Sequence, residues 1–261
     1  MGRVARRPEP WLVLLGSISL IAWSALALDG GDFIPPPFCS TVTAWPPPLS
    51  VSFDLALVLN SPAQLASGWA LMIAAMMSPL LVAPLRHMRE RSFARRRTRA
   101  VLLFVAGYGL MWMIAGVALQ ALALAALWAE PAPLLRFGIA AAVAMAWQVS
   151  PAKQWCLNRC HRQPPLAAFG AAADRDAFDF GVTNGAACVG ACWALMVLPL
   201  LAGPAHVLAM IAVTLFVFAE RLEEPAPLQW RWRGAGKALR IIAAQARMRL
   251  ASASRVGAAA R

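Results

Sequence analysis

The chain has 261 residues, of which 60% are hydrophobic and only 14% are charged, and its formal net charge is +12. This composition excludes an ordinary soluble basic protein and is typical of a membrane protein. Positive charge alone would suggest a nucleic-acid partner, but a polytopic protein can place its basic residues at one membrane face, so their position decides.

Uncharged apolar stretches that can cross the roughly 30 Å hydrocarbon layer occur along most of the chain. Three of them are long and strongly apolar, at residues 11–28, 65–85 and 100–128. Three shorter ones follow at residues 137–152, 183–201 and 206–219. The sequence therefore predicts an all-α, polytopic membrane helix bundle of about six transmembrane helices.

The distribution of Lys and Arg between these stretches predicts the orientation of the protein. With a cytoplasmic N-terminus and a change of side at each stretch, 23 of the 24 Lys and Arg residues fall in cytoplasmic segments, and only Arg136 falls outside. Basic residues concentrate on the cytoplasmic side of membrane proteins. We therefore expect both termini to be cytoplasmic, and we attribute the basic excess to orientation in a lipid bilayer and not to nucleic-acid binding.

The two ends of the chain and its largest loop lie outside the main membrane domain. Residues 1–28 predict a tail and a first helix, or else a secretory signal peptide, although the apolar run of 18 residues is longer than the usual signal core. Residues 29–64 contain two proline triplets and predict a stiff external loop, in which Cys39 has no second external cysteine. Residues 225–261 form a basic cytoplasmic tail, where 236–255 could be a membrane-surface helix or disordered.

Two cysteine pairs are the strongest candidates for chemistry. Cys156 and Cys160 in CLNRC, like Cys188 and Cys192 in CVGAC, are four residues apart. On an α-helix this spacing places both sulfurs on one face, about 6 Å apart, which suits two ligands of one metal ion. Both pairs lie toward the predicted cytoplasmic face on consecutive helices joined by a short loop, so we expect them to be neighbours.

Methionines repeat the same spacing. Met196 continues the face of the second cysteine pair, and Met72 and Met76 lie one turn apart in the second apolar stretch, where Pro79 is expected to distort the helix. Thiolate and thioether donors together favour Cu(I), although four cysteines alone would suit zinc equally well. Core packing is the alternative, because buried Met and Cys often only fill space. The predicted metal-binding membrane domain spans residues 65–224, and its predicted ligands are Cys156, Cys160, Cys188, Cys192, Met72, Met76 and Met196.

Two other functions stay open from the residues alone. The four cysteines could serve thiol–disulfide exchange, although C-x-x-C is the usual spacing for that chemistry, or they could be structural in a membrane assembly factor. The three histidines are scattered, so we find no nucleophile and base for an enzyme. We therefore expect a non-enzymatic role in metal delivery, storage or transport, with a metal-donating or metal-receiving protein as partner.

The segments around these motifs resemble a known family. GWALMIAAMMSPLL, SPAKQWCLNRC, GAACVGACWALM and FAERLEE, in this order between residues 68 and 224, are similar to a family of bacterial integral membrane proteins with a predicted metal-binding domain of unknown function. The resemblance implies a multi-helix membrane domain in which the Met-rich helix and the cysteine motifs form one constellation. We expect this domain to lie in the inner membrane of a bacterium. Many members carry a cysteine directly before the last one, where this chain has Ala191, so the resemblance does not extend to a fifth sulfur there. The matching positions are Trp69, Met72, Met76, Met77, Pro79, Cys156, Cys160, Cys188, Gly190, Cys192, Trp193, Met196 and Glu220.

Overall fold

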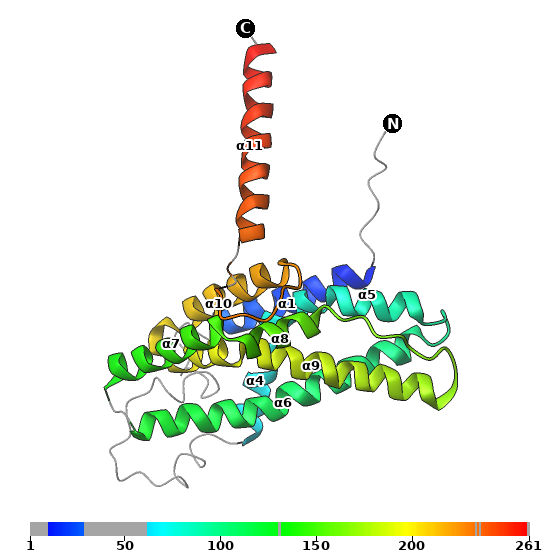
Figure 1. Cartoon of the computed structure of the whole chain (residues 1–261), viewed down its shortest axis with the longest axis horizontal. Coiled ribbons are helices and arrows are strands. Elements are labelled where there is room, and N and C mark those ends of the chain that lie inside the picture. Colours follow the sequence, from blue (N-terminus) through cyan, green and yellow to red (C-terminus); the bar gives the residue numbers. More distant parts are fainter. Residues whose placement is uncertain (1–9, 29–61, 130–131, 233, 235, 260–261) are drawn as a thin grey trace.

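Helices account for every element in the part of the chain that the structure describes, which confirms the predicted all-α class. Figure 1 shows most of them gathered in one elongated bundle. The predicted external loop lies outside the described residues, except for its last three residues, which begin a helix. The structure is a computed structural model, and it describes residues 10–28, 62–129, 132–232, 234 and 236–259. In chain order the elements are α1 (Pro10–Leu28), α4 (Pro62–Met77), the 3₁₀ turn η1 (Ser78–Leu81), α5 (Val82–Arg91), α6 (Arg97–Ala129), α7 (Pro133–Val149), α8 (Pro151–Cys160), α9 (Gly170–Leu201), the 3₁₀ turn η2 (Gly203–Ala205), α10 (His206–Arg221) and α11 (Gly236–Ala259).

The methionine-rich segment is a helix that changes its winding at its midpoint. Helix α4 packs against α1, and the Ser19 hydroxyl donates a 2.8 Å hydrogen bond to the carbonyl oxygen of Ala75. After Met77 the chain tightens into η1 before α5 continues in the same apolar segment. Pro79 lies in η1, where its missing N–H and its ring disturb the regular α-helical bonding, so the predicted local distortion is confirmed.

Helices α6 and α9 form the most extensive contact of the bundle, and two glycines make it possible. A β-carbon on Gly181 of α9 would lie 2.1 Å from the carbonyl oxygen of Phe104 on α6. One on Gly107 of α6 would lie 2.5 Å from the carbonyl oxygen of Phe178 on α9. The two backbones therefore reach this separation only because neither position carries a side chain.

This helix pair extends beyond its apolar part at one end. Helix α9 begins at Gly170, well before the apolar stretch predicted from residue 183. Near the start of α9, Asp174 pairs with Arg96 and with Arg99 at 2.7 Å each. Both helices therefore start at the same end of the bundle and run parallel, with a charged, solvent-exposed extension that the apolar pattern does not reveal.

A sharp bend divides the fourth predicted stretch, residues 137–152. Helix α7 ends at Val149 and α8 starts at Pro151, with an angle of 67° between them. The Ser150 hydroxyl accepts a 3.2 Å hydrogen bond from the backbone N–H of Lys153, so it caps the new helix. Proline is favoured in the first turn, where its missing N–H has no cost. The local sequence therefore starts a second helix instead of extending the first.

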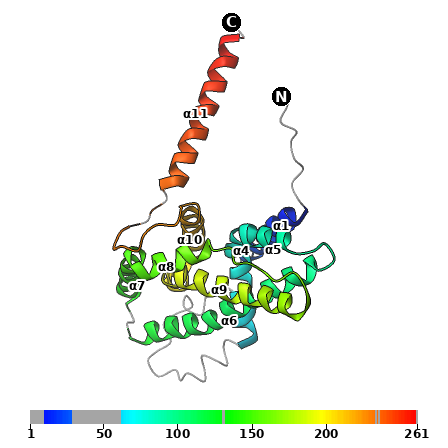
Figure 2. The same ribbon diagram turned by 45° about the vertical axis from the view of Figure 1, so that its right-hand side comes forward.

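The basic tail contains the helix that the sequence allowed, α11, which extends from residue 236 to residue 259. Figure 1 shows this helix standing away from the bundle, and Figure 2 shows the same separation from another direction. At its start, Lys237 donates a 3.0 Å hydrogen bond to Glu224, an exposed carboxylate in the segment that follows α10. This bond lowers the pKa of Glu224 below its usual value.

Several helices are long and apolar enough to cross a membrane. In the described part, four segments meet this condition, and the bent α7–α8 pair would make a fifth. Helix α1 is apolar but shorter. Large apolar side chains such as Leu102, Val117 and Leu208 are exposed on the outside, which suits contact with lipid. The architecture agrees with a membrane helix bundle, while six spans and two cytoplasmic termini stay predictions. The four segments are Leu65–Arg91, Arg97–Ala126, Gly170–Leu201 and Gly203–Arg221.

Candidate metal centre

Both cysteine pairs lie on α-helices, as their spacing predicted. Helix α8 carries Cys156 and Cys160, and α9 carries Cys188 and Cys192. All four are free thiols. The two helices pack directly against each other, so the prediction that they are neighbours is confirmed.

Three of these thiols surround the guanidinium group of Arg221, the last residue of α10. The positive charge of Arg221 acts on Cys160, Cys188 and Cys192, so its guanidinium lies close to all three sulfurs. The hydroxyl of Tyr108 on α6 donates a 3.3 Å hydrogen bond to the sulfur of Cys188. All three cysteines are more than nine-tenths buried. Four helices thus meet at one buried group of sulfurs, called the thiol cluster below (Cys160, Cys188 and Cys192).

Cys156 of α8 contacts a different side of α9 from the side that carries Cys188. Its sulfur rests against Gly190, where an added β-carbon would come within 2.5 Å of it. Gly190 is two residues from Cys188, and therefore about 200° around the helix from it. In the described part of the chain, no three or more His, Cys, Asp or Glu residues are arranged to hold a metal ion. The structure therefore arranges neither the four predicted cysteine ligands nor the three sulfurs of the thiol cluster as a complete metal site, and their ligation of one ion stays a prediction.

The predicted methionine ligands are fully buried. Met72, Met76 and Met196 are each no more than 2% exposed. They belong to the same continuous buried cluster as the three thiols. Met77, which lies about 100° around an ideal helix from Met76, is also buried, and the chain tightens directly after it. The position of these methionines agrees both with core packing and with a supply of thioether donors near the thiol cluster.

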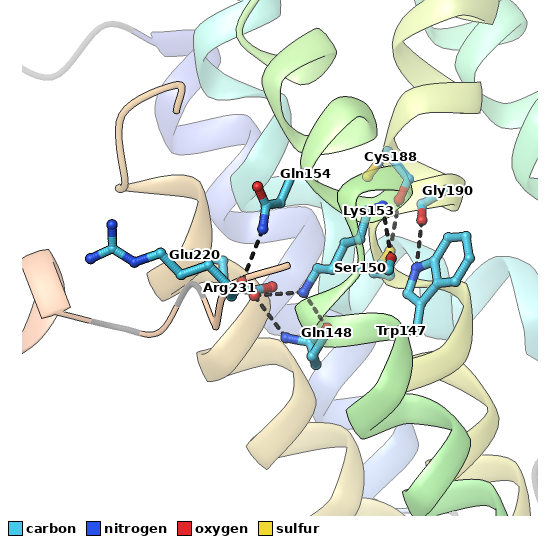
Figure 3. Close-up of polar contacts among 10 residues, drawn as sticks. Trp147, Gln148, Ser150, Lys153, Gln154, Cys188, Gly190, Glu220 and Arg231 are labelled. Carbon is cyan, nitrogen blue, oxygen red and sulfur yellow. Dashed lines mark hydrogen bonds and ion pairs between the residues drawn. The ribbon is translucent and has the colours of Figure 1, made fainter. Parts of the chain in front are cut away.

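A buried polar network lies at the bend between α7 and α8, and Figure 3 shows it. The ammonium nitrogen of Lys153 lies 2.5 Å from Oε1 of Glu220 on α10, and Gln148 Nε2 donates to the same oxygen at 2.7 Å. Lys153 also hydrogen-bonds to the side-chain oxygen of Gln148. All three residues are at most 2% exposed, and loss of one partner would leave a buried charge uncompensated. The network therefore holds the end of α10, and with it Arg221, against α8.

The segment between α10 and α11 covers another side of α8. The Gln154 amide donates to the carbonyl oxygens of Gln229 and Arg231 and accepts a 3.1 Å hydrogen bond from the backbone N–H of Gln229. One turn later the Asn158 amide donates to the carbonyl oxygen of Ala226 at 2.7 Å and accepts from its N–H at 3.2 Å. Figure 3 shows the contact of Gln154 with Arg231. The cysteine-bearing helix α8 is thus held between α9 and this segment.

Arg221, Tyr108 and Lys153 are not among the residues that the sequence singles out. Two signals were nevertheless present. Glu220 and Arg221 interrupt the end of an apolar helix, and ionisable residues in such positions are often functional. Tyr108 is the only tyrosine in the whole chain and lies inside an apolar stretch.

Comparison with known proteins identifies the family. No curated protein and no solved structure matches the chain significantly. A family of copper chaperones, PpoB2, matches residues 66–245, which is more than half of the chain. The matched part contains the methionine-rich helix, both cysteine pairs and the buried network with Arg221. The chain therefore belongs to the PpoB2 copper chaperone family.

Proposed function

We propose that the protein is a membrane-embedded copper chaperone that holds Cu(I) at the thiol cluster and passes it to a partner protein. The observation that carries this proposal is the proximity of one guanidinium, that of Arg221, to two buried thiols from different helices, Cys160 and Cys188. Thiolates are soft donors, which Cu(I) prefers. The family match supports copper as the cargo.

Arg221 supplies the charge that a copper–dithiolate group needs in an apolar environment. Two thiolates and one Cu(I) leave one negative charge, and the guanidinium of Arg221 neutralises it. A neutral group is far less costly to bury than a charged one. Zinc prefers four protein ligands in a closed site, and the thiol cluster contains three cysteines. The charge and the number of donors therefore favour Cu(I) over zinc.

Neighbouring groups adjust the cluster for binding and release. The Tyr108 hydroxyl, which donates to Cys188, stabilises negative charge on that sulfur, in the manner of outer groups around metal sites. The Cys192 thiol donates a 2.9 Å hydrogen bond to the carbonyl oxygen of Cys188, so rotation of this side chain releases a third sulfur donor. Met72 and Met76 on α4 would assist as thioether donors. The site can thus exchange ligands without rearrangement of a helix.

The location of the cluster suits delivery at one membrane face. Under the predicted topology, the end of α8 and the end of α10 lie at the cytoplasmic side of a bacterial inner membrane. A partner that donates or receives copper would approach there, close to the segment that covers α8. This assignment of sides depends on the distribution of Lys and Arg.

Cu(I) affinity of the purified protein in detergent, measured by competition with a Cu(I) chelator, tests the proposal. Cys160→Ser and Cys188→Ser should each weaken binding by about tenfold or more, because even loss of an outer group around a metal site costs about 10–100-fold. Cys156→Ser is the matched control on the same helix, since its sulfur lies against Gly190. It should leave the affinity unchanged.

Two outcomes would contradict the proposal. Unchanged copper affinity in the Cys160→Ser/Cys188→Ser double variant would exclude the thiol cluster as the binding site. Thiol labelling that reveals a disulfide between the two cysteine pairs after air oxidation, in a protein without copper affinity, would support thiol–disulfide exchange instead.

A further inference from the structure

His206, the first residue of α10, is a buried histidine with one ring nitrogen engaged and the other free. Its Nδ1 lies 2.8 Å from the carbonyl oxygen of Pro199 on α9. Because a carbonyl oxygen only accepts, Nδ1 carries the proton and Nε2 keeps its lone pair. Nε2 is buried without a hydrogen-bond partner among the described residues, and His206 is 8% exposed. An imidazole that is oriented by a backbone carbonyl and free at its other nitrogen has the form found in metal-bound histidine.

Two fully buried methionines lie one helical turn from this contact. Met210 follows His206 by four residues on α10, and Met196 precedes Pro199 by three residues on α9. Met210 shares a helix face with His206, and Met196 lies one turn before the residue whose carbonyl oxygen His206 contacts. Helices α9 and α10 are joined by the short turn η2 and pack against each other, so the two thioethers lie at the same depth in the bundle. Both methionines are 0% exposed and belong to one continuous buried cluster.

We propose that Nε2 of His206 and the thioethers of Met196 and Met210 form a second Cu(I) site, distinct from the thiol cluster. The site rests on the proposed function, because it takes copper as the cargo. Imidazole and thioether are borderline and soft donors, which suit Cu(I) and not Mg²⁺ or Ca²⁺. A buried nitrogen without a partner is costly, and a bound metal ion would engage this one.

This second site holds copper less tightly than the thiol cluster does. Its three ligands are neutral, so bound Cu(I) keeps its positive charge, whereas the thiolates and Arg221 neutralise the charge at the other site. Met196 follows Cys192 by four residues, and Cys192 follows Cys188 by four, so one face of α9 carries a sulfur at every turn between the two sites. Copper therefore passes by ligand exchange from the η2 end of the bundle to the thiol cluster, with no change of oxidation state.

The number of Cu(I) ions bound by the full-length protein, measured by chelator competition, tests the second site. The wild type should bind two ions of different affinity, and His206→Asn should lose the weaker one. Asparagine keeps an amide N–H for the Pro199 carbonyl oxygen but has no atom in place of Nε2. His87→Asn is the control, because His87 is equally buried and its Nε2 already lies 2.9 Å from the carbonyl oxygen of Pro164. It should keep both ions.

A variant with all five cysteines replaced by serine separates the two sites. It should retain one weakly bound Cu(I) whose X-ray absorption spectrum shows one imidazole nitrogen and thioether sulfurs, and His206→Asn should remove this ion. No copper in the cysteine-free variant, or an unchanged ion after His206→Asn, would overturn the second site and leave the thiol cluster standing. Equal copper binding by the wild type and the cysteine-free variant would overturn the thiol cluster instead. If the cysteine-free variant does not fold, the single His206→Asn substitution still decides.

Discussion

At the residue scale, the proposed copper site at the thiol cluster needs one cation, Arg221. Arg221→Met should lower Cu(I) affinity by about tenfold or more, because the copper–dithiolate group then keeps a buried negative charge. Arg221→Lys should retain part of the affinity, since the ammonium keeps the charge but loses the planar fork of donors. Arg159→Met controls for the overall loss of charge: Arg159 precedes Cys160, but its guanidinium stacks 4.4 Å from the Trp155 ring centroid. Equal affinities for the Met variants at both positions, measured by chelator competition, would contradict this role.

The buried ion pair gives a second prediction at this scale. Glu220→Gln should destabilise the protein by about 3–5 kcal/mol, because it leaves the ammonium of Lys153 buried without its carboxylate. The double variant Lys153→Met/Glu220→Gln should recover much of this loss, since it buries no charge. Unfolding in detergent, followed by circular dichroism, measures both. A double variant as unstable as the single one would show that the pair is not what holds α8 and α10 together.

At the scale of the elements, the close packing of α6 on α9 limits which residues can replace the glycines at their contact. Gly181→Ala should lower the free energy of unfolding by about 1–3 kcal/mol, because its β-carbon meets the backbone of Phe104 and the helices must separate. Gly109→Ala on α6 should be neutral or stabilising by up to about 1 kcal/mol, since nothing lies within 4 Å of the added carbon and alanine favours the helix. Thermal unfolding in detergent compares the two variants. Equal effects would show that the helices are not in close contact.

At the scale of the whole molecule, the charge distribution predicts the topology. A reporter that is active only in the cytoplasm should be active when fused at residue 95, between α5 and α6, or at the C-terminus. A reporter that is active only outside the cytoplasm should be active at residue 47. The reason is that 23 of the 24 Lys and Arg residues fall on one side when six spans are assumed. An external C-terminus would break the six-span topology, and the thiol cluster could then not be assigned to the cytoplasmic face.

The sequence by itself determined the features that depend on neighbours within a turn or two. Apolar composition and length predicted the helices, the four-residue spacing placed each cysteine pair on one helix face, and Pro79 marked the change of winding after Met77. Ser150 and Pro151 form a helix-start signal, but both lie within the apolar stretch 137–152, which reads as one helix. The bend between α7 and α8 is therefore not predicted by the apolar pattern.

Only the tertiary structure decided which helix faces meet. It brought Arg221 to Cys160 and Cys188, placed Cys156 apart from them against Gly190, and left one nitrogen of His206 free in the bundle. In an apolar helix, positions that face lipid and positions that face protein carry the same kinds of side chain, so periodicity does not distinguish them. Contacts between residues far apart in the chain then depend on close backbone approach and on a few buried polar groups, which become visible only when the helices are packed together.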